Sequence, residues 1–276
     1  MKTRILLTAL LAEAACLVAQ TRDLGGPFVH QYVAGCLGMA DDAFAVVRMP
    51  GGLSSARTGM AAVGATTDWM SEAGGRFTLA AAKPLKGDVL GLVIDHRKVG
   101  SYRSSHASLA YGIRLSDELQ AGLRLGFSHA RIQGYGSEVA LPFTLGAVYR
   151  MAQGLRFSLH ADHAGRPLSR GGPAEARLPF TVLFGVGQRF SEQTGIALQV
   201  FKQEGRPVSL IPMVQYRPAG VLDIRAGFSL QTSGLYLCLG YTMGEWRLDV
   251  SARHAGALGW STGLVIQWTA KEAEVP

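Results

Sequence analysis

The chain has 276 residues, of which 48% are hydrophobic and 17% are charged, and its formal net charge is +7. The charged fraction is low for a soluble surface. Outside the first twenty residues, however, no apolar run is long enough to span a membrane as a helix. The basic residues are scattered singly among apolar ones. Because nucleic-acid-binding proteins gather basic residues into a patch or stripe, we expect no nucleic-acid partner.

The first residues, MKTRILLTALLAEAACLVAQ, combine a basic start, an apolar stretch and a small residue before Gln20. This order is typical of a secretory signal peptide. We expect cleavage after Ala19, so that residues 1–19 form the signal, and the alternative is a first buried helix. Cleavage would remove Cys16 and leave Cys36 and Cys238, whose spacing does not decide whether they pair.

The next part of the chain, residues 20–56, contains small residues and paired glycines without sustained alternation. We expect it to form a compact N-terminal segment. Residues 57–270 follow as a strand-rich region, and residues 271–276 form a short tail. The chain therefore divides into a signal peptide, an N-terminal segment, one β domain and a tail.

Strict alternation of apolar and polar residues dominates the β region. In AGVLDIRAGFSLQTS, residues 219–233, every second side chain is apolar and those between are mostly polar. A strand points successive side chains to opposite faces, so one face meets an apolar medium and the other meets water. The same pattern recurs in residues 109–115, 119–128, 139–150, 155–162, 178–189, 246–253 and 258–268.

Two all-β architectures produce such alternation. A soluble sandwich has strands of about five or six residues, whereas a transmembrane barrel needs about nine to eleven. The alternation here persists for the longer distance, and tight turns such as SDE and MAQG alternate with longer polar stretches such as HRKVGSYRSS, ARIQGYGSE and DHAGRPLSRGGPAEA. We therefore predict a closed antiparallel transmembrane β-barrel of about 14 strands, with outer-membrane lipid as the partner of its apolar face.

Four arginines share one sequence context, because each lies just before a short turn. The alternation of each strand places the arginine on the face that lines the barrel interior. We expect them to form a positive collar at the inner mouth, which could hold an acidic N-terminal segment through Asp41 and Asp42 or attract anionic solutes. The alternative is that each arginine meets water or lipid head groups at the barrel end. The four are Arg114, Arg150, Arg189 and Arg217.

The sequence gives no sign of an enzyme. The histidines of the mature chain lack the spacing of metal ligands, and His160, Asp162 and His163 are their one local cluster. Nucleophile and phosphate-loop motifs are also missing. We therefore predict no catalytic residues, no metal and no cofactor.

The segment GMADDAFAVVRMPGGLSS resembles the opening of FadL-like outer-membrane proteins and of the PorV and PorQ proteins of type IX secretion. Those chains carry a GMG-type run, an acidic pair and an N-P-A-G-L-like motif, from which Met49 and Gly51 depart here. Residues 109–137 and 141–161, and the end RHAGALGWSTGLVIQW, are similar to related Bacteroidetes barrels. The matching residues are Gly38, Met39, Asp41, Asp42, Pro50, Gly52 and Leu53.

The resemblance implies a barrel of about fourteen strands in a Bacteroidetes-type outer membrane, with residues 20–56 inside its lumen. It implies two functions. The first is an accessory role in type IX secretion, in which loops engage the translocon or secreted proteins. The second is passive transport of hydrophobic small molecules, for which the mainly polar inward residues are unfavourable. A purely structural membrane protein is a third possibility that has no positive signature.

Overall fold

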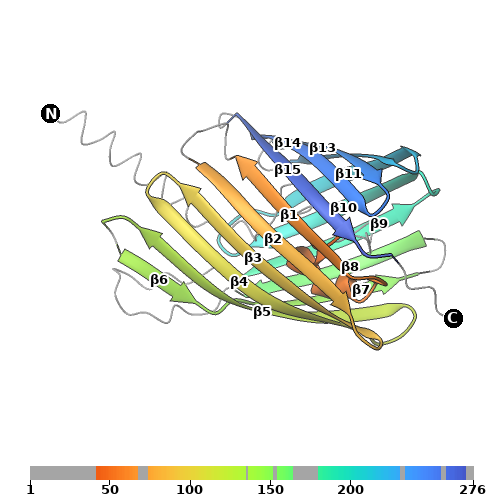
Figure 1. Ribbon diagram of the computed structural model, residues 1–276, viewed down its shortest axis with the longest axis horizontal. Helices are drawn as coiled ribbons and strands as arrows, with labels where there is room; N and C mark the ends of the chain where they lie inside the picture. The colour runs from red at the N-terminus through yellow and green to blue at the C-terminus, as the bar shows by residue number, and fades with distance from the viewer. Residues whose placement is uncertain are drawn as a thin grey trace.

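The computed structural model describes residues 42–67, 74–134, 136–151, 154–163, 180–230, 234–255 and 259–271. Two short helices precede fifteen strands in this part of the chain (Figure 1). None of the described helices is long and apolar enough to cross a membrane. The elements are α3 Ala45–Arg48, α4 Pro50–Leu53, β1 Met60–Thr67, β2 Gly74–Pro84, β3 Asp88–Val99, β4 Tyr102–Arg114, β5 Leu119–Ile132, β6 Gly136–Ala140, β7 Phe143–Arg150, β8 Leu155–His163, β9 Thr181–Arg189, β10 Thr194–Gln203, β11 Ser209–Ala219, β12 Leu222–Ser229, β13 Gly234–Met243, β14 Trp246–Ala255 and β15 Trp260–Thr269.

Fourteen of the strands form a closed antiparallel barrel, as predicted. The first strand pairs with the last, with Met60 opposite Thr269, and β4 pairs with β5. Each barrel strand therefore has a hydrogen-bonded neighbour on both sides. Closure is required in lipid, because an open sheet edge would leave backbone groups without partners.

The fifteenth strand, β6, continues β7 beyond a proline. Both lie against β5 in one register, with Ala140 opposite Ser128 and Phe143 opposite Leu125. Pro142, between them, has no backbone N–H to donate, but its carbonyl accepts a hydrogen bond of 2.9 Å from the Gly126 amide. The proline thus interrupts the ladder without changing the register.

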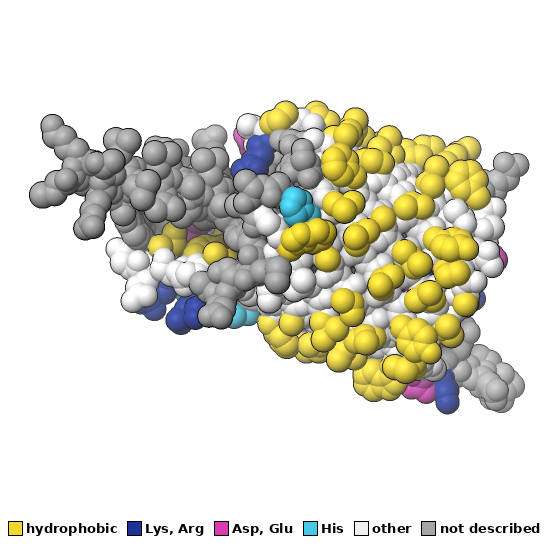
Figure 2. Space-filling model, turned by 90° about the horizontal axis from the view of Figure 1, so that it is seen from above, with side chains coloured by type: hydrophobic (Ala, Val, Ile, Leu, Met, Phe, Trp, Pro, Cys, Tyr) yellow, Lys and Arg dark blue, Asp and Glu magenta, His cyan; other side chains and the backbone are white. Residues whose placement is uncertain are grey.

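The two faces of the wall differ as the alternation predicts. On β12 the polar side chains Asp223 and Arg225 are buried in the lumen, whereas Phe228 is exposed on the outside. Hydrophobic side chains cover the outer surface in a broad belt (Figure 2). Leu109, at 66% exposure, and Leu125, at 57%, belong to it. Water would make such a surface an aggregation site, so the belt is the lipid-facing surface of a transmembrane barrel.

Two stretches predicted as polar loops are strands instead. HRKVGSYRSS belongs to β3 and β4, which continue to a tight turn at Gly100 and Ser101. ARIQGYGSE lies mostly in β5 and β6. The prediction was wrong because the alternation stops beyond the apolar belt, where outward side chains such as Lys98 and Arg103 are polar as well. The third stretch, DHAGRPLSRGGPAEA, lies almost entirely outside the described residues, as do the signal peptide and most of residues 20–41.

Candidate functional site: the occupied lumen

The short segment Asp42–Ala56 lies inside the barrel and contains both helices. We call it the plug. Its described side chains are all buried, and Gly52 is partly exposed. At its start the Asp42 carboxylate accepts a hydrogen bond of 2.8 Å from the Phe44 amide. The Ala43 amide donates to Gln267 Oε1 on β15 at 3.2 Å.

Glycines in three neighbouring strands let the plug approach the wall. A Cβ at Gly122 would lie 2.2 Å from the Pro50 carbonyl oxygen, and one at Gly112 would lie 2.9 Å from the same atom. On the plug side, a Cβ at Gly51 would lie 2.8 Å from the Gly146 carbonyl oxygen. Backbone therefore meets backbone here, at distances that no side chain would permit.

Two arginines of the wall bind the plug. Arg124 donates to the Val47 carbonyl at 2.6 Å and to Thr144 Oγ1 at 2.9 Å. Asp162 lies 3.6 Å from Arg124 and accepts a hydrogen bond of 2.5 Å from Thr144. This buried charge therefore has a carboxylate partner and also satisfies a carbonyl at the end of α3.

The second arginine, Arg150, binds the end of the plug. It donates to Ser55 Oγ and, at 3.3 Å, to Gln120 Oε1, which also accepts from Ser55 at 2.9 Å. This arginine is one of the four predicted for the collar. Its position links the inner mouth of the barrel to the C-terminal end of the plug.

The other predicted collar residues have different surroundings. Arg114 and Arg57 lie within electrostatic range of Arg150, and Arg189 lies within range of Arg156. Arg217 instead forms an ion pair of 3.5 Å with Asp223. The mouth therefore brings together Arg57, Arg114, Arg150, Arg156 and Arg189, of which Arg57 and Arg156 were not predicted.

The N-terminal motif is divided by the limit of the described residues. Gly38, Met39 and Asp41 lie outside them. Asp42 lies within electrostatic range of Arg225. Pro50, Gly52 and Leu53 form α4, which contacts β4, β5 and β7.

A charged network lines the opposite wall. Arg225 and Arg247 each lie 2.8 Å from Asp223, and Arg247 also lies 2.9 Å from Asp249. Gln215 donates to both Asp223 oxygens. Most charged groups of this network therefore have an oppositely charged partner within it. Such pairing is needed because removing a charge from water costs free energy. Inward parity of charged residues in mid-strand was the sequence signal that could have identified it.

The wall formed by β1–β4 is apolar where it meets the plug. Ala62, Ala80 and Val93 are among the wall residues, and Phe44 and Val46 are among the plug residues packed against them. Small wall side chains leave room for the larger plug side chains. Next to the plug the lumen thus has an apolar wall, formed by β1–β4, and across from it a charged wall, although Arg76 on β2 and Asp95 on β3 form a buried ion pair of 2.9 Å on the apolar side as well. The complete apolar cluster is Ala43, Phe44, Val46, Val47, Leu53, Ala56, Met60, Ala62, Ala80, Ala82, Val89, Val93, Ala110 and Val265.

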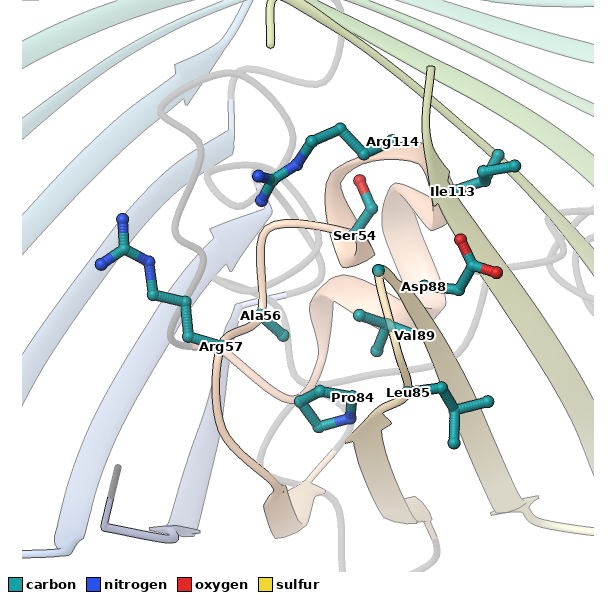
Figure 3. A pocket seen from close by; sticks show the side chains of 10 residues that line it. Ser54, Ala56, Arg57, Pro84, Leu85, Asp88, Val89, Ile113 and Arg114 are labelled. Atoms are coloured by element: carbon teal, nitrogen blue, oxygen red, sulfur yellow. The ribbon is translucent and has the colours of Figure 1, made fainter. Parts of the chain in front are cut away.

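A pocket of about 490 Å³ opens beside the end of the plug. Figure 3 shows the guanidinium groups of Arg57 and Arg114 on the same side as Ser54, while the Asp88 carboxylate points away from them. Apolar side chains, among them Val89, complete its lining. The pocket therefore combines a cationic side with an apolar side.

No group of three potential metal ligands occurs among the described residues. His160 is buried, and Asp162 forms the ion pair with Arg124 given above. The His163 side chain lies outside the described part of the structure. Cys238 is a buried free thiol of the lumen, and Cys36 lies outside the described residues.

No protein-family model matches the chain, and no curated protein matches it. Solved structures do share its fold. The toluene transporter TodX of Pseudomonas putida superposes with a TM-score of 0.62 at 10% identity, covering 82% of this chain and 92% of that one. The Ralstonia pickettii toluene transporter TbuX superposes with a TM-score of 0.62 at 12% identity, covering 83% of this chain and 94% of that one. A Pseudomonas aeruginosa FadL homologue superposes with a TM-score of 0.54 at 11% identity, covering 83% of this chain and 93% of that one. The fold is that of FadL-like outer-membrane barrels.

Proposed function

We propose that this protein is an outer-membrane channel for the passive entry of small hydrophobic molecules, and that the plug controls the route. The apolar interface between the plug and the β1–β4 wall is the observation that carries the proposal. The fold shared with two toluene transporters and a FadL homologue supports it. The signal peptide predicted at residues 1–19 would supply the export that this location needs.

The geometry offers a hydrophobic solute one favourable path. On the β1–β4 side, moving the plug would uncover wall residues such as Ala80, Ala82 and Val93. An apolar molecule could occupy the same surface and so compensate for the lost contacts. On the opposite side, Asp223, Arg225 and their partners hold charge that an apolar molecule cannot solvate.

A disulfide between plug and wall tests this proposal. A Cβ at Gly91 would lie 2.6 Å from Val46 Cγ1. Since a cysteine sulfur would replace that γ carbon, Val46→Cys with Gly91→Cys brings two thiols within bonding reach. The pair is placed in a Cys36→Ala, Cys238→Ala background, and the two single cysteine variants are the matched controls.

The assay measures initial uptake of radiolabelled toluene by cells that express each variant. We expect the oxidised double variant to lose protein-dependent uptake and to regain it after reduction, while the single variants do not respond to oxidant. Undiminished uptake with the disulfide formed would refute the proposal, because the plug would then not lie on the route.

An accessory role in type IX secretion is a second candidate. The resemblance of GMADDAFAVVRMPGGLSS to PorV and PorQ openings supports it, and part of this segment forms the plug. Deleting the gene in its host and measuring export of proteins with type IX sorting domains is the appropriate test. Normal export in the deletion strain would dismiss this role without affecting the transport proposal.

A further inference from the structure

Three cations stand directly opposite one another on the outside of β3, β4 and β5. Lys98 is opposite Arg103, and Arg103 is opposite Arg131. All three are exposed. Since opposite residues share a face and adjacent strands lie about 4.8 Å apart, the row is about 10 Å wide at the backbone. We call these three residues the cationic row.

The described acidic side chains do not neutralise this row. No described acidic side chain forms an ion pair with any of the three. Asp95 on β3 is buried in the lumen. Glu138 on β6 is opposite Ala130 and faces inward, away from the row. Like charges placed directly opposite in a sheet destabilise it, so an anion bound at the row would relieve repulsion.

The row lies at the boundary of the lipid-facing belt. Immediately below it along the strands, His96, Ser105 and His129 form a polar row, in which His96 Nδ1 is 3.0 Å from Ser105 Oγ. The next two rows contain exposed apolar side chains, including Ile94 and Phe127. The surface therefore changes from apolar to polar to cationic over three consecutive rows.

The height of the row agrees with this boundary. Leu90 and Tyr111 form an outward row near the short-turn end. Lys98 is eight residues further along β3, or about 27 Å at the usual rise. A strand tilt of about 40° reduces this to roughly 20 Å along the barrel axis, while the apolar band of such barrels is about 25 Å tall. The cationic row thus lies where head groups begin.

Figure 1 shows the tips of β3, β4 and β5 at one end of the barrel. Figure 2 shows Lys and Arg side chains beyond the hydrophobic belt at that same end. The opposite end holds the short turns and both ends of the barrel sequence, Met60 and Thr269. Short turns face the periplasm in bacterial barrels, and the other end faces outward. The cationic row therefore meets the outer leaflet.

We propose that Lys98, Arg103 and Arg131 bind the phosphate groups of an outer-leaflet glycolipid, the lipid A portion of lipopolysaccharide. Guanidinium groups recognise phosphate oxygens in bidentate fashion, and the adjoining belt accommodates acyl chains. One head group with two phosphates can engage more than one cation of the row. This inference rests on outer-membrane placement and does not depend on what the lumen transports.

The test compares binding of bisphosphorylated lipid A to the purified detergent-solubilised barrel by native mass spectrometry. Lys98→Gln, Arg103→Gln and Arg131→Gln are combined in one variant. The matched control combines Lys83→Gln, Lys86→Gln and Lys271→Gln, which removes equal charge from exposed positions at the short-turn end. At about fivefold per cation, we expect roughly one-hundredfold weaker binding for the first variant and unchanged binding for the control.

Equal loss in both variants, or none in either, would overturn the proposal. So would equally tight binding of lipid A lacking its phosphates, or of phosphatidylglycerol. Displacement of the lipid by millimolar inorganic phosphate would indicate a free-anion site instead. Arg103→Gln alone removes both opposed charge pairs, so it should fold at least as well as the parent while binding lipid A more weakly.

Discussion

Replacing Gly122 by alanine tests whether the plug depends on backbone contact with the wall. The new methyl carbon would lie 2.2 Å from the Pro50 carbonyl oxygen and 2.7 Å from the Gly51 nitrogen. Ordinary contacts of carbon atoms lie at about 3.5 Å. The plug must therefore move by more than an ångström, because a barrel strand paired on both sides cannot yield.

The expected cost follows from what that movement disturbs. Overpacking a close-fitting interior costs about 1–3 kcal/mol, and a displaced plug also weakens the 2.6 Å bond from Arg124 to the Val47 carbonyl. We expect Gly122→Ala to lower the unfolding temperature in detergent. We also expect it to raise the conductance of the protein in planar lipid bilayers, since less of the lumen would be filled.

Gly220→Ala is the control, because a Cβ there would meet nothing within 4 Å. It should behave like the parent protein in both assays. If Gly122→Ala also retained the unfolding temperature and conductance of the parent, the close approach of Pro50 to the wall could not be what seats the plug.

Three further predictions concern the wall. Arg124→Gln leaves the buried Asp162 without its cation, so we expect a loss of about 3–5 kcal/mol in unfolding free energy, which Asp162→Asn should partly restore in the double variant. Leu109→Arg, at a site 66% exposed, should destabilise the barrel by about 2–4 kcal/mol in bilayers; a change within about 0.5 kcal/mol, typical of a water-exposed site, would contradict the lipid-facing assignment. Cys238, 2% exposed, should resist maleimide in the folded protein and react after denaturation, as followed by mass spectrometry; rapid labelling of the native barrel would show that the lumen is open at this depth.

The alternation predicted the wall because lipid and lumen impose opposite demands on successive residues. Asp223 and Arg225 were placed inside and Phe228 outside from parity alone, and the structure agrees. The same rule explains the errors. Residues 96–105 extend beyond the apolar belt, so their outward side chains are polar or charged like most of their inward ones, and this polar pattern was interpreted as a loop although the residues belong to β3 and β4.

The site was less predictable because parity identifies a face but not the neighbour across the lumen. Gly112, Gly122 and Gly146 belong to three separate strands, and only the barrel register brings them to the plug. Arg124 looked like one more inward polar residue, although it binds both Val47 and Thr144. Parity assigned Arg150 to the inward face, but its contact with Ser55 depends on the path of the plug.

The unequal walls of the lumen suggest how a plugged barrel could still admit a solute. The charged wall pairs Asp223 and Arg225 with each other, so it needs no polar group from the plug to compensate them. Near the apolar wall, the plug is held by nonpolar contacts of Phe44 and Val46, together with the hydrogen bond from Arg124. A hydrophobic molecule can replace nonpolar contacts but not the charged network. Solute entry should therefore displace the plug along the β1–β4 side and leave the opposite wall unchanged.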